Sequence, residues 1–266
     1  MKIVLLDYGT LGPEIDLSPL RDAGELVAYE MTAQEGIAAR IQDADVVITN
    51  KLKLNRQSLA LALSNKLITY RDHVHSGFYS RSGSPNILTP VWHELAGKTW
   101  GIVGCGNIGR KVADVAKALG CKVLVYRRKP DPDYENADLD ALLQQSDVVS
   151  VHLPLNDETR GILSREKIAL MKKDAIFVNV ARGAVADEAA LADAVAAGKL
   201  AGLGVDVFSA EPMPEDHPYS RILDKDNVIF TPHCAWSAKE ARNRCVREVA
   251  ENICAFSRGE KRNRCC

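Results

Sequence analysis

The sequence of 266 residues lacks any long apolar run. No segment approaches the roughly 20 consecutive apolar residues of a transmembrane helix. The apolar run Ile3–Leu6 near the start is also too short for the hydrophobic region of a secretory signal. We therefore expect a cytoplasmic protein that has no membrane partner.

A strong charge of one sign is absent as well. The formal net charge is −1, so the chain has no general attraction to nucleic acid or to an anionic surface. Hydrophobic content of 46% and charged content of 26% are ordinary for a globular protein. These values favour a small molecule or another protein as the partner, and they argue against nucleic acid.

Metal-binding and disulfide patterns are also missing. The seven cysteines have no CxxC spacing and no small secreted context, so ordinary thiols are expected. His73, His75 and His93 lie close in the sequence, but no Cys or carboxylate accompanies them at convincing ligand spacing. We therefore predict no metal site.

Short apolar runs that alternate with helix-compatible segments are present along most of the chain. This alternation is typical of βαβ units and a parallel sheet. In the first part, the predicted strands are Ile3–Leu6, Leu26–Tyr29, Ala44–Thr49 and Leu67–Tyr70. From Tyr70 to about Gly97, Gly, Ser, Pro and Asn interrupt the pattern, which predicts a loop or a connection between domains.

A second alternating series begins at Lys98. Its predicted strands are Thr99–Val103, Lys122–Tyr126, Asp147–Val151, Ala175–Val180, Leu200–Val205 and Val228–Phe230. Several of these are continuous apolar runs, as expected for strands that helices cover on both faces. A final helix is predicted after a capping box at Ser237–Glu240. Its apolar face is formed by Val246, Val249, Ala250, Ile253 and Phe256.

A glycine-rich turn follows the first strand of the second series. The segment Gly104-Cys105-Gly106-Asn107-Ile108-Gly109 opens a predicted helix that runs toward Leu119. In a dinucleotide site, one glycine permits the tight turn, the second lets a pyrophosphate approach the backbone, and the third lets helix and strand pack closely. This context predicts that Gly104, Gly106 and Gly109 bind a dinucleotide. The alternative is a purely structural glycine turn.

The end of the next predicted strand bears on which dinucleotide is bound. A site that prefers NAD has an acidic residue about 20 positions after the glycine loop, where it binds the ribose 2′-hydroxyl. This chain has Tyr126-Arg127-Arg128-Lys129 there. Guanidinium groups favour a charged 2′-phosphate, so Arg127 and Arg128 favour NADP over NAD. The alternative is that they are solvated surface cations.

Polar residues follow three predicted strands on the same side of the sheet. They lie in Asn179–Gly183, Asp206–Pro212 and Thr231–His233. Ligands of open α/β sheets bind outside the carboxyl ends of the strands, so these segments can converge on one site. Arg182, Glu211 and His233 are the candidate catalytic residues in them.

These three residue types suit the reduction of a 2-oxo acid. The guanidinium of Arg182 matches a planar substrate carboxylate, and the imidazole of His233 can exchange a proton near neutral pH. Glu211 would orient that imidazole and favour its protonated form. Hydride transfer itself would belong to a nicotinamide. Taken singly, each residue also fits a structural role, as a turn cap, a surface carboxylate or a packed histidine.

With these motifs the chain resembles the D-isomer-specific 2-hydroxyacid dehydrogenases, the family of phosphoglycerate, glycerate, glyoxylate/hydroxypyruvate and D-lactate dehydrogenases. The resemblance runs from about His93 to Asn263. The matching stretches are Ala96–Thr99 before the glycine loop, His152–Leu155 with Thr159, Asn179–Gly183, Asp206–Pro212 and Thr231–His233. A methyltransferase with a similar glycine loop would explain neither the catalytic set nor Asp206.

The resemblance implies a role for each matching residue. Arg182, Glu211 and His233 occupy the family's catalytic positions. The implied cofactor contacts are the backbone of Asn107 and Ile108 at the pyrophosphate, Val180 and Ala181 beside the nicotinamide, Asp206 at its carboxamide, and Pro154 and Thr159 on the adenosine side. The expected reaction is hydride transfer between a nicotinamide cofactor and a small 2-hydroxy or 2-oxo acid.

The resemblance also implies the fold and its domains. We expect an α/β protein with a Rossmann-type doubly wound parallel sheet and a second, shortened flavodoxin-like α/β domain. Residues 98–236 are assigned to the dinucleotide-binding domain, and residues 1–69 with 237–266 to the substrate domain. Residues 70–97 are assigned to a connecting segment. The final helix would return to the first domain.

The chain departs from the family pattern between Thr69 and Tyr70. Relatives carry a Gly-rich loop and a long linking helix after the strand that Leu67–Thr69 resembles, and this chain has neither. The segment from Tyr70 to Gly77 instead resembles the part of the relatives that comes after that helix. We therefore predict impaired activity, with a catalytically silent NAD(P)-binding or interaction protein as the alternative. Because relatives are usually dimers, the resemblance implies a homodimer, although the linking helix that helps form that interface is absent here.

Overall fold

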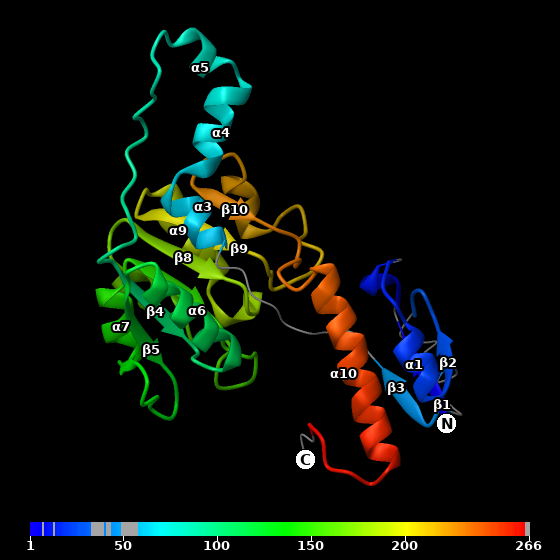
Figure 1. Cartoon of the computed structure of the whole chain (residues 1–266). Coiled ribbons are helices and arrows are strands. Elements are labelled where there is room, and N and C mark those ends of the chain that lie inside the picture. Colours follow the sequence, from blue (N-terminus) through cyan, green and yellow to red (C-terminus); the bar gives the residue numbers. More distant parts are fainter. Residues whose placement is uncertain (7, 13, 33–39, 41–43, 49–57, 264–266) are drawn as a thin grey trace. The chain divides into compact units, whose positions relative to one another are not determined.

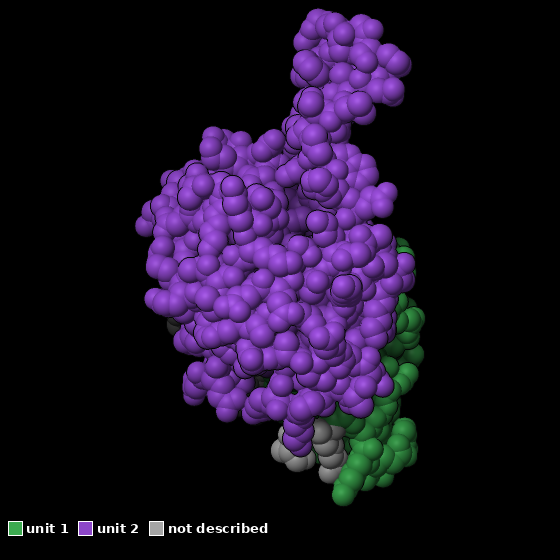
Figure 2. Space-filling view, turned by 90° about the vertical axis from the view of Figure 1, so that its left-hand side faces the viewer, with its two compact units in different colours: residues 1–54, 235–266 green, residues 55–234 purple. Residues whose placement is uncertain are grey.

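The computed structural model describes residues 1–6, 8–12, 14–32, 40, 44–48 and 58–263 (Figure 1). The chain forms two compact units, which are drawn in different colours in Figure 2. The smaller unit contains residues 1–54 and 235–266, and the larger unit contains residues 55–234. The sequence-based assignment gave residues 1–69 to the smaller domain and treated residues 70–97 as a connecting segment, whereas residues 55–97 fall in the larger unit.

The larger unit is built on a seven-stranded parallel sheet. Its strands, in order across the sheet, are β10 (Val228–Phe230), β9 (Leu200–Val205), β8 (Ala175–Asn179), β7 (Val148–Val151), β4 (Thr99–Val103), β5 (Lys122–Tyr126) and β6 (Glu135–Asn136). The chain order reverses at β4, which has β5 on one side and β7 on the other. The predicted Rossmann-type sheet is thus confirmed, together with all six strands of the second series. The two-residue strand β6 was not predicted, because both of its residues are polar and exposed.

Helices cover this sheet on both faces, because successive strand residues point to opposite sides. Val149 and Phe177 face one core with α7 (Leu139–Gln145), α8 (Arg165–Leu170) and α9 (Glu188–Ala196). Val148 and Ile176 face the other core with α3 (Ser58–Ser64) and α6 (Asn107–Ala118). Two short 3-10 helices, η3 (Gly183–Val185) and η4 (Pro218–Ile222), follow β8 and β9. The two cores explain why the strands read as continuous apolar runs.

The predicted strand Leu67–Tyr70 is wrong, because these residues begin helix α4 (Leu67–His75). A short apolar run does not distinguish a strand from a helical segment. The preceding helix α3 packs on the sheet, with Leu63 close to Gly202 of β9. A further helix, α5 (Phe78–Arg81), lies where the sequence predicted a loop. Figure 1 shows α4 and α5 projecting from the end of the larger unit, with the following segment returning to the sheet.

The smaller unit has a three-stranded parallel sheet in its described residues. The order is β2 (Glu25–Ala28), β1 (Lys2–Leu5) and β3 (Val46–Ile48), which confirms the first three predicted strands. This order matches the first three strands of a flavodoxin-like sheet. The unit also contains η1 (Tyr8–Leu11), α1 (Ser18–Ala23) and the final helix α10 (Lys239–Ser257). Its core joins Ile3, Leu5, Leu20, Val246 and Ile253.

Helix α10 confirms the predicted final helix but not its start or its whole apolar face. The N-cap is Ala238, which forms no side-chain cap, so the predicted box at Ser237–Glu240 is wrong. The Ser237 carbonyl instead accepts a hydrogen bond from Arg242 Nε at 2.8 Å. Phe256 is 69% exposed and therefore lies outside the core. Among the described residues, no helix is both long and apolar enough to cross a membrane.

Candidate active site

The glycine loop connects β4 to α6 in a shape that depends on two of its glycines. Gly104 has φ +99°, and a Cβ there would lie 2.9 Å from the backbone of His152 and Leu153. A Cβ on Gly109 would lie 2.2 Å from the carbonyl oxygen of Gly104. These two positions therefore require glycine for packing and conformation.

Gly106 differs from the other two, because a Cβ built there would meet no protein atom within 4 Å. It is the N-cap of α6 and forms no side-chain cap, so Asn107 and Ile108 supply the first amide groups of the helix. Amides at a helix start lack intrahelical partners and attract anions. The residues of this loop therefore fit a phosphate-containing cofactor.

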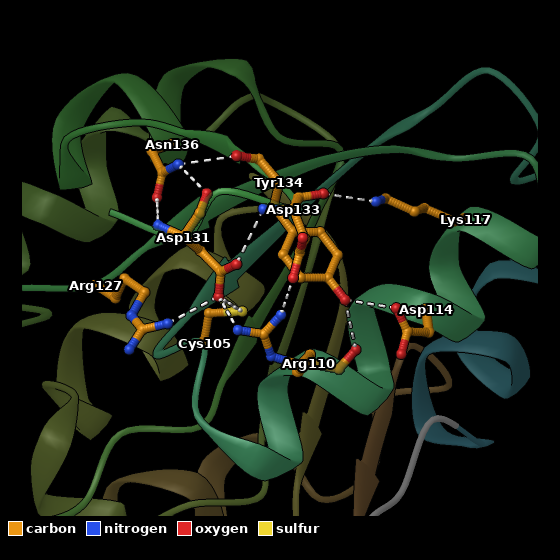
Figure 3. A network of polar contacts seen from close by, with 9 residues as sticks. All are labelled: Cys105, Arg110, Asp114, Lys117, Arg127, Asp131, Asp133, Tyr134 and Asn136. Atoms are coloured by element: carbon orange, nitrogen blue, oxygen red, sulfur yellow. Dashed lines mark hydrogen bonds and ion pairs between the residues drawn. The ribbon is translucent and has the colours of Figure 1, made fainter. Parts of the chain in front are cut away.

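A buried carboxylate lies beside this loop (Figure 3). The side chain of Asp131 is fully buried, and its Oδ2 atom accepts from Arg110 Nη2 at 2.6 Å and from Arg127 Nη1 at 2.8 Å. Arg110 belongs to α6, and Arg127 follows β5. Asp131 therefore joins the helix of the glycine loop to the strand end where the cofactor preference was predicted.

Asp131 remains charged despite its burial. Burial disfavours the charge, but the Asp133 N–H, Arg127 and Arg110 outweigh it and hold the pKa of the Asp131 carboxyl below its ordinary value. Burial raises the pKa of the neighbouring Cys105 thiol, and the charge of Asp131 raises it further. Cys105 is therefore expected to stay a thiol at neutral pH.

The two predicted cofactor arginines have different surroundings. The Arg127 side chain is 33% exposed and is held by Asp131. Arg128 is 85% exposed and pairs with Glu158 at 3.1 Å. Exposed pairs of this kind restrain a side chain weakly. Of the two, only Arg127 is fixed by a buried partner.

A hydrogen-bonded pair follows the ends of β9 and β10. Glu211 Oε2 lies 2.7 Å from His233 Nδ1, and both side chains are about one-third exposed, at 34% and 30%. The other Glu211 oxygen, Oε1, accepts from the Phe208 backbone N–H at 3.0 Å. The carboxylate therefore faces Nδ1 of the ring. Nε2 is the ring nitrogen that Glu211 does not contact. The predicted contact of Glu211 with His233 is present.

Buried polar side chains shape the turns that carry this pair and Arg182. Asp206 Oδ1 accepts from the Thr231 hydroxyl and from the Cys234 backbone N–H, which fixes the chain on both sides of His233. Asn179 Oδ1 accepts from the Ala181 N–H at 3.0 Å, and its amide donates to the Arg182 carbonyl at 2.9 Å. Both are almost fully buried.

The turn of Arg182 lies against the segment that carries Glu211. A Cβ on Gly183 would be 2.1 Å from the Phe208 carbonyl carbon, so the two backbones are in contact. Arg182 itself donates to the Ala181 carbonyl at 2.7 Å. The structure thus brings the three predicted segments together at neighbouring strand ends.

The remaining predicted cofactor residues lie along the same edge of the sheet. Val180 and Ala181 follow β8, and Ala181 is buried. Pro154 follows β7, and its carbonyl accepts from the Thr159 hydroxyl at 2.6 Å. Strand order reverses between β7 and β4, and in open α/β sheets ligands bind outside the carboxyl ends of the strands at such a point.

Two features near the site were missed in the sequence. One is Asp131, and the other is a buried pair of Glu188 and His217, whose Oε2 and Nε2 atoms are 3.0 Å apart. Asp131 lies in a polar segment, and Glu188 is a charged residue at the start of an apolar helix, so neither residue type nor spacing indicated that these carboxylates are buried. Separately, within the residues that the structure describes, no three His, Cys, Asp or Glu side chains gather in a way that could hold a metal ion.

Comparison with known proteins relates this geometry to one family. The model of the NAD-binding domain of D-isomer specific 2-hydroxyacid dehydrogenases matches residues 57–235. A hydroxypyruvate reductase of Blautia hydrogenotrophica is 33% identical over 311 aligned positions, covering 95% of this chain and 96% of the relative. A hydroxypyruvate reductase of Thermotoga maritima is 36% identical over 259 positions, covering 91% and 84%.

A solved structure shares the arrangement of elements. The D-lactate dehydrogenase of Aquifex aeolicus, complexed with NAD and lactic acid, is 26% identical with a TM-score of 0.80. The match covers 98% of this chain and 96% of that one.

The alignment with the Blautia hydrogenotrophica relative is longer than the 266 residues of this chain, so that relative contains positions that this chain lacks.

Proposed function

The chain belongs to the family of D-isomer-specific 2-hydroxyacid dehydrogenases, and from this premise we propose that it is an oxidoreductase acting on small 2-hydroxy or 2-oxo acids with a nicotinamide cofactor. The observation that carries the proposal is the hydrogen bond between Glu211 and His233, beside the turn of Arg182. The glycine loop with its open Gly106 supports cofactor binding.

The nicotinamide, when bound, supplies or accepts the hydride. Arg182 binds the substrate carboxylate through its planar guanidinium. His233 holds a proton at Nε2 and gives it to the 2-oxygen during reduction, or takes it back during oxidation. Glu211 keeps Nδ1 protonated and stabilises the charged ring. Reduction of the 2-oxo acid and oxidation of the 2-hydroxy acid therefore use the same proton position on His233 and the same hydride transfer, in opposite directions.

We propose that the remaining predicted residues bind the cofactor. Asn107 and Ile108 offer backbone amides to the pyrophosphate, and Pro154 and Thr159 border the adenosine side. Val180 and Ala181 border the nicotinamide. Asp206 binds the nicotinamide carboxamide, and its Oδ1 also accepts from the Cys234 N–H beside His233.

The residues that follow β5 favour NADP as the cofactor. Arg127 follows that strand with a partly exposed guanidinium, which suits a 2′-phosphate. Asp131 does not replace the missing acidic residue of an NAD site, because both of its carboxylate oxygens are already engaged, Oδ2 by Arg110 and Arg127 and Oδ1 by the Asp133 N–H. Arg127→Ala is expected to raise the KM for NADPH by about tenfold or more, since a charged hydrogen bond contributes roughly 1.5–3 kcal/mol. The KM for NADH should change little. Arg128→Ala is the matched control with a smaller effect, and equal effects on both cofactors would contradict the assignment.

We propose that the smaller unit is a shortened substrate domain. The extra aligned positions of the Blautia hydrogenotrophica relative support this proposal. Fewer oriented donors around the substrate would lower turnover, since misplacement of about 1 Å can cost roughly a hundredfold in rate. We also propose a cytoplasmic location and a homodimer.

The shortening favours a second candidate function, a catalytically silent NAD(P)-binding or interaction protein. Oxidation of NADPH, and separately of NADH, with glyoxylate, hydroxypyruvate and pyruvate distinguishes the two. Turnover that falls by about 10²–10⁴-fold in His233→Asn would support the enzyme. Cofactor binding without turnover by the folded protein would support the silent protein.

A further inference from the structure

A second pair of glutamate and histidine lies buried behind the segment of Glu211. Glu188 is the first residue of α9, and His217 precedes η4. Their side chains are only 8% and 3% exposed, and Oε2 and Nε2 are 3.0 Å apart. The mechanism above uses neither residue, so their burial requires another explanation.

The hydrogen bonds around His217 determine which ring nitrogen carries the proton. The Tyr219 backbone N–H donates to His217 Nδ1 at 3.2 Å. A backbone N–H can only donate, so Nδ1 must be unprotonated. The proton is therefore on Nε2, which donates it to the Glu188 carboxylate. His217 is thus a neutral ring, and Glu188 is an acceptor.

Glu188 connects this pair to the segment of Glu211. Its second oxygen, Oε1, accepts from the Ser209 backbone N–H at 3.0 Å. The preceding N–H, that of Phe208, donates to Glu211 Oε1 at 3.0 Å. Two successive backbone amides are therefore held by two different carboxylates, one buried and one beside His233.

Ring packing restrains the same segment from the other side. The Phe208 ring meets the His217 ring edge to face, with centroids 5.8 Å apart at 86°. It also contacts the rings of Tyr219 and Phe230. His217 is therefore packed against the residue whose N–H orients Glu211.

We propose that Glu188 and His217 are positioning residues for the reaction, which hold residues 208–211 so that Glu211 keeps Nδ1 of His233 protonated. The inference rests on the proposed function, because that function assigns Glu211 and His233 their roles. Neither Glu188 nor His217 touches substrate or cofactor in this scheme. Their effect reaches the reaction through Ser209, Phe208 and Glu211.

Two side-chain changes separate this role from general stability. Glu188→Gln keeps the shape but places an amide group against a ring nitrogen or a backbone N–H, so two donors face each other. His217→Gln keeps a donor toward Glu188 and should preserve the connection. Ser146→Ala is the control, because Ser146 is also buried but lies before β7, at the amino ends of the strands and away from Glu211.

Turnover with NADPH and hydroxypyruvate is the first measurement. In Glu188→Gln we expect kcat to fall by about tenfold to a hundredfold while the NADPH Kd stays unchanged, as expected from misplacement of a catalytic group. Combining Glu188→Gln with Glu211→Gln should add little further loss, because both changes act on the same contact. Unchanged kcat in Glu188→Gln, or fully additive losses, would overturn the proposal.

A second measurement does not require activity. Long-range proton–nitrogen NMR correlations show which imidazole nitrogen carries the proton, and His233→Asn and His217→Gln identify the two rings. In the unaltered protein at alkaline pH, we expect His217 protonated at Nε2 and His233 protonated at Nδ1. Glu188→Gln should shift His233 toward the opposite form. An unshifted His233, or His217 protonated at Nδ1 in the unaltered protein, contradicts the proposal even if the chain proves catalytically silent.

Discussion

Gly106 and Gly109 are both glycines of the loop before α6, but the surroundings of the two residues differ. Gly109 packs against the Gly104 carbonyl, whereas the space above Gly106 contains no protein atom within 4 Å of a Cβ position. Gly106→Ala should therefore lower the Tm only slightly, through a poorer N-cap, but weaken NADPH binding, because the methyl group enters the space proposed for phosphate. Gly109→Ala should lower the Tm, because helix and strand must move apart.

Differential scanning fluorimetry and fluorescence titration with NADPH measure the two quantities. Gly161→Ala provides a control for replacing an open glycine, since a Cβ there also meets no protein atom, although its φ of +64° adds strain. Normal NADPH affinity in Gly106→Ala would place the phosphates elsewhere.

Sequence alone predicted Arg182, Glu211 and His233, because each lies in a segment directly after an apolar strand. The contact of Glu211 with His233 followed from those strand ends. Glu188 and Asp131 could not be predicted in the same way. Asp131 lies in a polar stretch and Glu188 is a charged residue at the start of an apolar helix, and only the packing of neighbouring elements buries these carboxylates.

At the scale of elements, Asp131 links α6 to the end of β5 through Arg110 and Arg127 (Figure 3). The folded pKa of Asp131 is below the unfolded value of about 3.9. Its contribution to stability is therefore present above about pH 4 and is lost as the pH falls through the lower, folded pKa. Acidification from about pH 5 to pH 3 should reduce the urea midpoint more in the unaltered protein than in Asp131→Asn.

Asp133→Asn is the matched control, because Asp133 also pairs with Arg110 but is 67% exposed. It should retain the acid sensitivity of the unaltered protein. If Asp131→Asn retained it as well, the buried carboxylate would not be the group whose protonation weakens this link.

The projecting helices α4 and α5, with the segment that returns from them, are a candidate surface for the proposed homodimer. Exposed apolar side chains concentrate there: Leu67, Val74, Phe78, Tyr79, Leu88, Val91 and Trp92. Monomeric proteins rarely expose contiguous apolar patches of large area. Replacing Val74 and Leu88 together by Asp should convert a dimer to a monomer without lowering the Tm of the larger unit.

Light scattering coupled to size-exclusion chromatography measures this change. Exchanging Leu223, which is exposed outside this segment, for Asp is the control and should leave the mass unchanged. A monomeric unaltered protein would refute the homodimer, and a dimer that survives the double change would exclude this surface.

Elements differed in how well their sequences predicted them. Continuous runs such as Thr99–Val103 and Leu200–Val205 matched their strands, because both faces of these strands are covered. The run Leu67–Tyr70 was wrongly predicted as a strand, since Leu67 and its neighbours form an exposed helix. The capping box also failed, because α10 begins after Ala238.

At the scale of the whole molecule, the larger unit contains a seven-stranded sheet and the smaller unit a sheet of three described strands. The fold class and the two sheets followed from the alternation of apolar runs. The boundary at residue 54 did not, because residues 58–69 carry no signal that assigns their helices to one sheet or the other. The central question is whether this chain performs the reaction of its family.

Oxidation of D-glycerate and L-glycerate with NADP+ tests that question most directly, with His233→Asn measured in parallel. We predict that NADP+ is reduced with D-glycerate and not with L-glycerate, and that His233→Asn loses about 10²–10⁴-fold of the rate. Equal rates with both isomers, or full activity in His233→Asn, would contradict the proposed mechanism. No reduction with either isomer, and no oxidation of NADPH with glyoxylate, hydroxypyruvate or pyruvate, by a folded protein that binds NADPH would contradict the enzyme and favour the silent cofactor-binding protein.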